Sequence, residues 1–352
     1  MSTVVHSPSR SLVRAVTMYG PGDVRVERRE APAISHPTDA VVRTVATCVC
    51  GSDLWPYRGA DPVSEPLRMG HEYVGVVEEV GSAVDEIRPG QFVVGSFCIA
   101  DNTCANCRDG WQSSCVRLDF MDGCEAEYIR VPYADGMLVA LDEHPGVEFV
   151  PSLLAVSDVM GTGWYAAVAA DVRTGSTAVV VGDGAVGLCG VLAAKALGAE
   201  RIIAMSRNGS RQELAREFGA TPVIAGRGDD GVAEVQDLTG GTGADSVLEC
   251  VGTDESMEQA LRSARAGGNV GFVGVPHEVA LASYELFFSQ VGLRGGPVPV
   301  RRFLPDLIDR VLTGPDRPGE GLRRRAAARQ GSRGVSGHGR SAGRESPAAA
   351  VS

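Results

Sequence analysis

The sequence predicts an α/β protein that combines a mostly β domain with a doubly wound parallel sheet. Up to about residue 150, short apolar runs such as 41–45 and 73–77 alternate with Gly and Pro, which is typical of short strands joined by turns. From 153 to 296, strand-like and helix-like patterns alternate, and this alternation is typical of a parallel sheet. The length of 352 residues agrees with two domains of about 150 residues each.

The second region carries the clearest signals for individual elements. Strands are expected at 179–181, 201–205, 246–250 and 269–275, and helices at 185–197, 210–218 and 254–265. For the second helix, Ser210 is the expected N-cap, Glu213 stands in the capping-box position and Gly219 is the stop signal.

The composition argues against several classes of protein. A hydrophobic fraction of 44% and a mean hydropathy near zero allow ordinary cores to form. The net charge of −11 argues against a nucleic-acid partner and against anionic membranes. No apolar run approaches the roughly 18 residues of a membrane span, and the first residues lack a secretory signal. We therefore expect a cytoplasmic protein whose nine cysteines are not paired as disulfides.

A glycine-rich turn follows the strand at 179–181 and consists of Gly182, Asp183, Gly184, Ala185, Val186 and Gly187. The first glycine permits a tight turn, the second lets a pyrophosphate approach the backbone, and the third lets helix and strand pack closely. The helix N-terminus offers N–H groups to the phosphates. The strand–turn–helix context predicts a dinucleotide site, and a purely structural glycine turn is the alternative.

The end of the next strand indicates which dinucleotide binds. An NAD site usually has Asp or Glu there, whose carboxylate accepts the ribose 2′-hydroxyl. Nineteen residues after Gly187 this chain has Ser206, followed by Arg207, and Arg211 lies one helical turn further on. A hydroxyl and guanidinium groups favour a 2′-phosphate. The pattern therefore predicts NADP, and NAD with Arg207 as a surface residue is the alternative.

Cysteine and histidine residues at characteristic spacings indicate metal chemistry. Cys50 and His71 lie twenty-one residues apart in the β-rich region, and thiolate and imidazole are ligands that Zn²⁺ prefers. Alone, such a pair would more often be packing residues. Cys104, Cys107 and Cys115 are bunched together, which favours a further metal site.

These motifs follow the order and spacing of a known family. They are Cys50-Gly51-Ser52-Asp53, then Gly70-His71-Glu72 continuing to Gly75, Gly81 and Val84, then Asp101-x2-Cys104-x2-Cys107-x7-Cys115, and the turn at 182–187. From about Leu12 to Leu312 the chain resembles the medium-chain, zinc-dependent alcohol dehydrogenases, in particular the NADP-linked bacterial type. The resemblance implies a GroES-like, mostly β catalytic domain and a Rossmann-like dinucleotide-binding domain.

The resemblance also implies a catalytic zinc site. Cys50, His71 and Asp158 would be its protein ligands, because bacterial NADP-linked members place a carboxylate at the third position. Glu72 would be a nearby carboxylate that can approach the metal or exchange onto it. A catalytic zinc typically has three protein ligands and one open position.

Neighbouring residues would orient the ligands and move the proton. Asp53 would accept a hydrogen bond from the free N–H of His71 and fix its tautomer. Ser52 would hydrogen-bond the alcohol oxygen and start a proton relay. Many family members continue that relay with His where this chain has Trp55, which puts the exit route of the proton in doubt.

A second, structural zinc would be held by Asp101, Cys104, Cys107 and Cys115. The family usually has Cys at the first of these positions, but a carboxylate oxygen is an acceptable zinc ligand. Cys98 is a rival for this fourth place, at a less suitable spacing. Cys48, Cys124, Cys189 and Cys250 show no ligand pattern and are expected to be small buried hydrophobes.

The expected activity is hydride transfer between NADP(H) and a primary or secondary alcohol, or the matching aldehyde or ketone, with two zinc ions per subunit. Family members assemble as homodimers or homotetramers, so an oligomer is implied by resemblance. Two alternatives stay open. One is a zinc-independent quinone or enone reductase of the same superfamily, and the other is a nucleotide-binding relic with impaired catalysis.

The C-terminal region differs in composition from the two predicted domains. The plan is a catalytic domain at 1–152, a dinucleotide-binding domain at 153–296, a return to the catalytic domain at 297–313, and an aberrant tail at 314–352. In that tail eight Arg face three acidic residues, and the large aliphatic residues are Leu322, Val335 and Val351, so disorder is expected. A frameshift is the hypothesis for its origin, because codons can be chosen for 314–340 so that deleting one base gives an amphipathic reading that resembles the family's C-terminus. A natural disordered tail is the alternative.

Overall fold

A computed structural model describes residues 12–277, 279–314, 316–319 and 321–322 of the chain. Contacts within the chain define two compact units, one up to Ser157 and one from Asp158. The boundary between them lies close to the predicted one after residue 152. No described helix is both long and apolar enough to cross a membrane.

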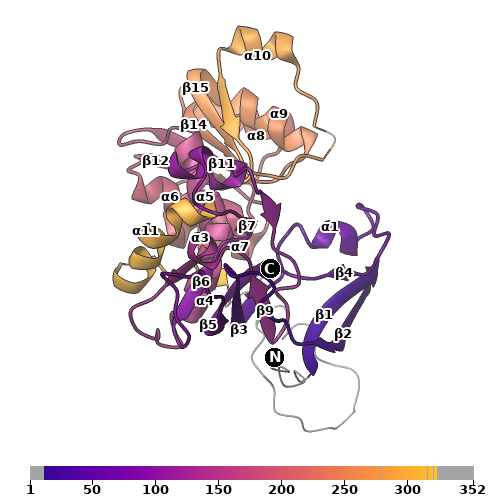
Figure 1. Cartoon of the computed structure of the whole chain (residues 1–352). Helices are drawn as coiled ribbons and strands as arrows, with labels where there is room; N and C mark the ends of the chain where they lie inside the picture. The colour runs from indigo at the N-terminus through magenta and orange to yellow at the C-terminus, as the bar shows by residue number, and fades with distance from the viewer. Residues whose placement is uncertain (1–11, 278, 315, 320, 323–352) are drawn as a thin grey trace, which may run out of the picture. The chain divides into compact units, whose positions relative to one another are not determined.

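The first unit is built mainly from antiparallel strands, which confirms the predicted β-rich architecture. Its five-stranded sheet has the order β10-β6-β5-β3-β9. The members of that sheet are β3 (Ala40–Cys48), β5 (Glu72–Val80), β6 (Phe92–Gly95), β9 (Tyr128–Val131) and β10 (Leu138–Ala140). A three-stranded sheet consists of β1 (Leu12–Gly20), β2 (Asp23–Glu30) and β4 (Leu67–Arg68), and β1 and β2 form its long hairpin (Figure 1). A two-stranded ribbon consists of β7 (Cys98–Ile99) and β8 (Asp119–Phe120).

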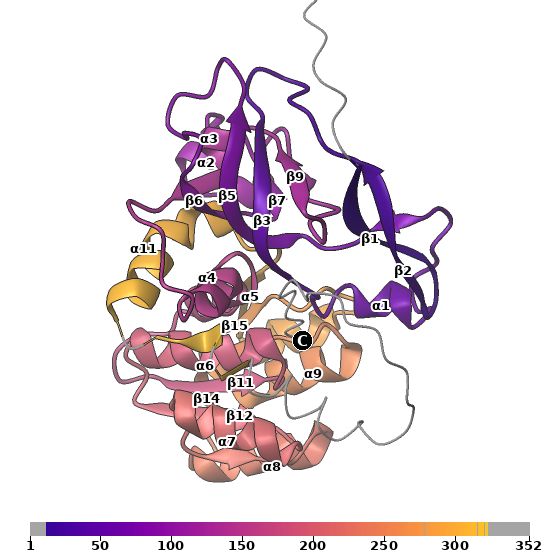
Figure 2. The ribbon, with the colours of Figure 1, turned by 90° about the horizontal axis from the view of Figure 1, so that it is seen from below.

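Short helices connect the strands of this unit. They are α1 (Leu54–Tyr57), α2 (Ala105–Arg108), the 3-10 helix η1 (Gln112–Ser114), α3 (Ala134–Met137) and α4 (Val150–Val156). Strands β3 and β5 lie side by side in the five-stranded sheet, and α4 packs against both of them (Figure 2). Their register pairs Cys48 directly with Glu72, so the end of β3 faces the start of β5.

The second unit is a doubly wound parallel sheet, as the sequence predicts. Its strands have the order β13-β12-β11-β14-β15-β16. They are β11 (Thr177–Val181), β12 (Arg201–Met205), β13 (Val223–Ile224), β14 (Ala244–Glu249), β15 (Ala264–Phe272) and β16 (Gly292–Gly295). The order reverses beside β11, and in sheets of this kind ligands bind at the carboxyl ends of the strands at that point.

Helices cover both faces of this sheet, and β-branched residues such as Val179, Ile203 and Val247 fill the core between the layers. The helices are α5 (Val159–Ala169), α6 (Ala185–Ala196), α7 (Gly209–Phe218), α8 (Gly228–Leu238), α9 (Asp254–Ser263), α10 (Ser283–Ser289) and α11 (Val300–Thr313). Helices α5 and α6 pack together on one face, and α8 and α9 pack together on the other (Figure 1).

Among the differences from the predicted element boundaries, two concern the starts of α7 and β15. The N-cap of α7 is Asn208, whose side chain accepts a hydrogen bond from the backbone N–H of Arg211, so the prediction of Ser210 is wrong. Asn caps a helix as well as Ser does, and the Ser210 hydroxyl instead donates to Asn208 Oδ1 at 2.8 Å. Strand β15 begins at Ala264, five residues before the predicted 269–275, and its pairing with β14 shifts register between Ala264 and Asn269.

The C-terminal part of the described chain belongs to the second unit. Helix α11 packs against α5, whereas the sequence plan has 297–313 return to the first domain. Within the described part of the tail, Leu322 is buried and Gly321 lies against Leu214 and Phe218 of α7. At Gly321 and Leu322 the structure therefore differs from the disorder expected from Gly314 onward, because these two residues are packed. Residues 323–352 lie outside the described part of the chain.

Candidate metal centres and dinucleotide site

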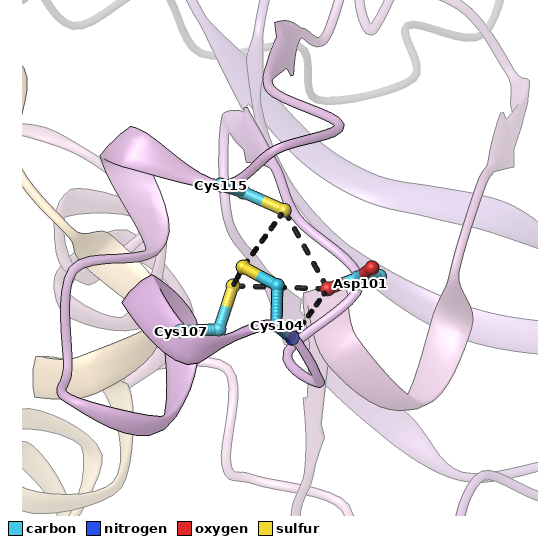
Figure 3. A group of neighbouring side chains, drawn as sticks. All are labelled: Asp101, Cys104, Cys107 and Cys115. Atoms are coloured by element: carbon cyan, nitrogen blue, oxygen red, sulfur yellow. Dashed lines mark hydrogen bonds between the residues drawn. The ribbon is translucent and has the colours of Figure 1, made fainter.

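Asp101, Cys104, Cys107 and Cys115 converge in the first unit, and their potential ligand atoms all lie within 4.8 Å of one another (Figure 3). Cys104 caps α2, Cys107 lies inside α2, and Cys115 follows η1, so one compact loop presents all three sulfurs. Cys98, the predicted rival for the fourth place, lies in β7 and is not part of this group.

The spacing of these atoms fits a tetrahedral zinc ion. Zn–S bonds of about 2.3 Å at tetrahedral angles separate two sulfurs by about 3.8 Å, and a sulfur from an oxygen ligand by about 3.6 Å. The Sγ of Cys104 lies 3.5 Å from that of Cys107 and 4.0 Å from that of Cys115. Asp101 Oδ1 lies 3.8 Å from Cys107 Sγ and 3.5 Å from Cys115 Sγ. The four residues therefore match the size of a four-coordinate zinc site.

The charges around this group also fit a cation. Burial, followed by the neighbouring thiols, raises the pKa of Cys107 to about 12. Backbone N–H groups of Val116 and Cys107 lower the pKa of Cys104 to about 7. Asp101 turns Oδ1 toward the sulfurs, while its Oδ2 pairs with Arg117 Nε at 3.2 Å. Three clustered thiols become thiolates together only beside a positive charge, which a divalent ion provides.

A second group in the same unit includes Cys50, His71 and Glu72, whose potential ligand atoms lie within 4.8 Å of one another. Cys50 follows the end of β3, and His71 directly precedes Glu72, the first residue of β5. The register of these antiparallel strands thus brings together residues twenty-one positions apart. Thiolate, imidazole and carboxylate are a donor set that suits zinc.

Asp53 supports this second group. Its Oδ2 accepts the backbone N–H of Cys50 at 2.8 Å, which fixes the turn after β3. Its Oδ1 lies 3.9 Å from His71 Nδ1, which is longer than the hydrogen bond expected between these two residues. Ser52 is exposed in the same turn, and Trp55 lies in α1.

Two residues near this group were missed by the sequence analysis. Cys48 is buried as expected, but it is more than a hydrophobe, because its Sγ donates to Glu72 Oε2 at 3.0 Å. The signal in the sequence that could have indicated this role was the Cys-x-Cys spacing between Cys48 and Cys50. Burial and then the charge of Asp53 raise the pKa of Glu125 to about 7, and His71 opposes that shift. Glu125 lies between strands, where no sequence motif marks it.

Asp158, the predicted third ligand of the catalytic zinc, is the first residue of the second unit. It occupies the N-cap position of α5, two residues after α4 ends. Its side chain is buried, and its Oδ1 accepts a hydrogen bond from Thr162 Oγ1 at 2.7 Å.

The glycine-rich turn between β11 and α6 has the geometry of a phosphate-binding loop. Gly182 has φ +113, which favours glycine, and a Cβ on Gly187 would meet the carbonyl oxygen of Gly182 at 2.1 Å. A Cβ on Gly184 would meet nothing within 4 Å, so the space in front of this residue is open. The backbone at 182–187 therefore fits the approach of a pyrophosphate to the N-terminus of α6.

At the end of β12, Ser206 and Arg211 both bind the side chain of Asp183, a residue for which the sequence predicted no role. Asp183 Oδ2 accepts a hydrogen bond from Ser206 Oγ at 2.7 Å, and Oδ1 accepts one from Arg211 Nη1 at 2.6 Å. Burial raises the pKa of Asp183, but these two bonds outweigh it and hold the pKa below its usual range. Arg207 is exposed.

Comparison with known proteins assigns both units. Residues 36–143 match the alcohol dehydrogenase GroES-like domain, and residues 185–312 match the zinc-binding dehydrogenase family. The chain is 34% identical over 320 residues to zinc-type alcohol dehydrogenase B of Aspergillus flavus, covering 87% of this chain and 74% of that protein. It is 32% identical over 309 residues to the NADP-dependent isopropanol dehydrogenase of Clostridium beijerinckii, covering 84% and 87%.

A solved structure leads to the same assignment. The alcohol dehydrogenase TADH from Thermus sp. ATN1 superposes with a TM-score of 0.79 at 33% identity, covering 87% of this chain and 91% of that one. The ligand groups, the glycine-rich turn and the similarity over both units agree with one another. The chain therefore belongs to the zinc-containing, medium-chain alcohol dehydrogenase family.

Proposed function

We propose that this NAD(P)-dependent alcohol dehydrogenase transfers a hydride between NADP(H) and a primary or secondary alcohol, or the matching aldehyde or ketone. The observation that carries the proposal is the convergence of Cys50, His71 and Glu72 in a chain whose second unit has a dinucleotide-binding turn. Zinc bound there would polarise the substrate oxygen as a Lewis acid, and the nicotinamide would carry the hydride.

Asp158 is proposed as the third protein ligand of this zinc. Its support is the continuity of the chain, because Asp158 follows α4 by two residues and α4 packs against both β3 and β5. Those strands carry Cys48 and Glu72, and Cys50 lies two residues after β3 while His71 directly precedes β5. Asp158 therefore places a buried carboxylate just after the end of α4, and such a carboxylate is suited to bind a cation.

The remaining residues orient groups and move the proton. Asp53 fixes the turn that carries Cys50, and its carboxylate on the Nδ1 side of His71 would orient the imidazole for metal binding. Cys48 holds one oxygen of Glu72, which limits how that carboxylate turns toward the metal. The exposed hydroxyl of Ser52 would accept the alcohol proton and pass it to solvent. Homodimeric or homotetrameric assembly and a cytoplasmic location stay predictions.

The proposal is tested with the purified, zinc-loaded protein, a panel of alcohols, aldehydes and ketones, and both nicotinamide cofactors. We expect turnover that a zinc chelator removes and added Zn²⁺ restores. Reduction of an enone double bond that survives chelation would instead identify a zinc-independent reductase. Cofactor binding without any turnover would identify a relic.

The choice of cofactor gives a separate prediction. We expect a higher kcat/KM with NADP than with NAD, because Ser206 replaces the usual acid and Arg207 follows it. Arg207→Ala should weaken NADP by about 1.5–3 kcal/mol, the scale of a charge-assisted hydrogen bond, and leave NAD nearly unchanged. Arg216→Ala, an exposed arginine in the last turn of α7, is the control. Equal losses with both cofactors would contradict the role of Arg207.

A further inference from the structure

We infer that Asp183 is a specificity-determining residue that reduces the preference for NADP over NAD. It does so by presenting a carboxylate beside the end of β12 and by pairing with Arg211. The inference rests on the proposed nicotinamide-dependent function. It concerns a residue between the glycines of the phosphate-binding turn, a position at which the motif itself calls for no particular side chain.

The register of the sheet builds this contact. β11 pairs with β12 in parallel, and Val181 is the partner of Met205. The residues that follow these strands therefore emerge side by side at the carboxyl edge, Asp183 on one turn and Ser206 on the next. Hydrogen bonds of 2.7 Å from Ser206 and 2.6 Å from Arg211 hold both carboxylate oxygens of Asp183. The carboxylate is thus fixed in place by two elements that are distant in sequence.

Its position is where a dinucleotide site reads the adenosine ribose. In such sites a carboxylate at the end of the second strand accepts the ribose 2′-hydroxyl, whereas a nearby arginine accommodates a 2′-phosphate. In this chain the strand ends with Ser206, and Asp183 supplies the carboxylate from the glycine-rich turn. A ribose 2′-hydroxyl can donate to that carboxylate, and a 2′-phosphate would be repelled by it.

Asp183 also reduces the positive charge that Arg211 can offer to a 2′-phosphate. The guanidinium of Arg211 pairs with Asp183, and the two side chains are only 29% and 12% exposed, so the positive charge is largely offset. Of the two arginines predicted to bind a 2′-phosphate, Arg211 is thus paired within the protein, and Arg207 is exposed at the end of β12. Asp183 therefore lowers affinity for NADP in two ways, by repulsion and by compensating Arg211, and it supports the binding of NAD.

The test is calorimetric binding of NADP⁺ and NAD⁺ to the zinc-loaded protein without alcohol. Asp183→Asn keeps the size of the side chain and removes its charge, and we expect the affinity ratio of NADP⁺ to NAD⁺ to rise about tenfold or more. Arg211→Gln should change the ratio in the opposite direction, because Asp183 is then uncompensated. The double variant, which combines Asp183→Asn with Arg211→Gln, should lose most of the increase in the affinity ratio that Asp183→Asn alone produces. Melting temperatures measured alongside show that each variant is folded.

Asp245→Asn is the matched control. Asp245 forms a similar pair with Arg265, at 2.6 Å, but lies at the amino end of β14, on the opposite edge of the parallel sheet. This variant should leave the ratio unchanged. Equal effects of Asp183→Asn on both dinucleotides, or the same ratio as the wild type, would overturn the inference and show that the pair only stiffens the turn. A wild-type protein that binds neither dinucleotide would overturn the proposed function and this inference together.

Discussion

Cys50→Ala is expected to abolish alcohol oxidation, lowering kcat/KM by about a thousandfold or more while leaving the fold and dinucleotide binding intact. The reason is that the thiolate is one of the few protein ligands of the proposed catalytic zinc, whose Lewis acidity contributes several kcal/mol to the reaction. Because the turn at 50–53 is also held by Asp53, the backbone should keep its conformation without the sulfur. Steady-state kinetics and elemental analysis measure the two effects.

Zinc content separates the possible outcomes for Cys50. The wild type should contain two zinc ions per subunit and Cys50→Ala one. Cys124→Ala is the control, because Cys124 is fully buried in the same unit and belongs to neither ligand group. A wild type with a single zinc that Cys50→Ala retains would show that the catalytic site is empty and would contradict the prediction.

Cys107→Ala is expected to release the other zinc and to lower the free energy of unfolding by about 3 kcal/mol or more. Binding of a structural zinc contributes directly to folding, and the loop from Asp101 to Cys115 contains only short helices. Because the thiols must lose protons to bind the metal, zinc affinity should also fall as the pH is lowered. Denaturant unfolding, with zinc analysis on the same samples, measures both effects.

Variants of Asp101 and Cys98 test the composition of this site. Asp101→Ala should release the zinc, whereas Asp101→Cys, which restores the family's usual ligand, should retain it. Cys98→Ala should retain the zinc as well, since Cys98 is outside the group. Loss of zinc in Cys98→Ala together with retention in Asp101→Ala would make Cys98 the fourth ligand and contradict the assignment.

The sequence was sufficient where the decisive pattern is local. Alternating strands and helices predicted the parallel sheet, because each period is a property of a few consecutive residues. The spacing of Cys104, Cys107 and Cys115 predicted a metal site, because fourteen residues of chain from Asp101 can carry all four ligand atoms to within 4.8 Å of one another. The glycine-rich turn was found in the same way, from its steric demands on six adjacent residues.

Sequence reasoning was weaker where neighbouring signals compete or where a segment departs from the usual pattern. Asn208 and Ser210 are both good N-caps, and only the path of the chain after β12 decides that Asn208 ends up at the start of α7. Gly321 and Leu322 belong to no periodic pattern, yet Gly321 lies against Leu214 and Phe218 of α7 and Leu322 is buried.

By itself, the sequence determined the family, the two architectures and the candidate ligands, since each depends on residue types at short or fixed spacings. Only the tertiary structure decided which side chains those residues meet. Cys48 contacts Glu72 because of the register between β3 and β5, and Asp183 contacts Ser206 and Arg211 because β11 and β12 end side by side. The physical reason is that strand pairing brings together residues more than twenty positions apart, and spacing along the chain does not encode such contacts.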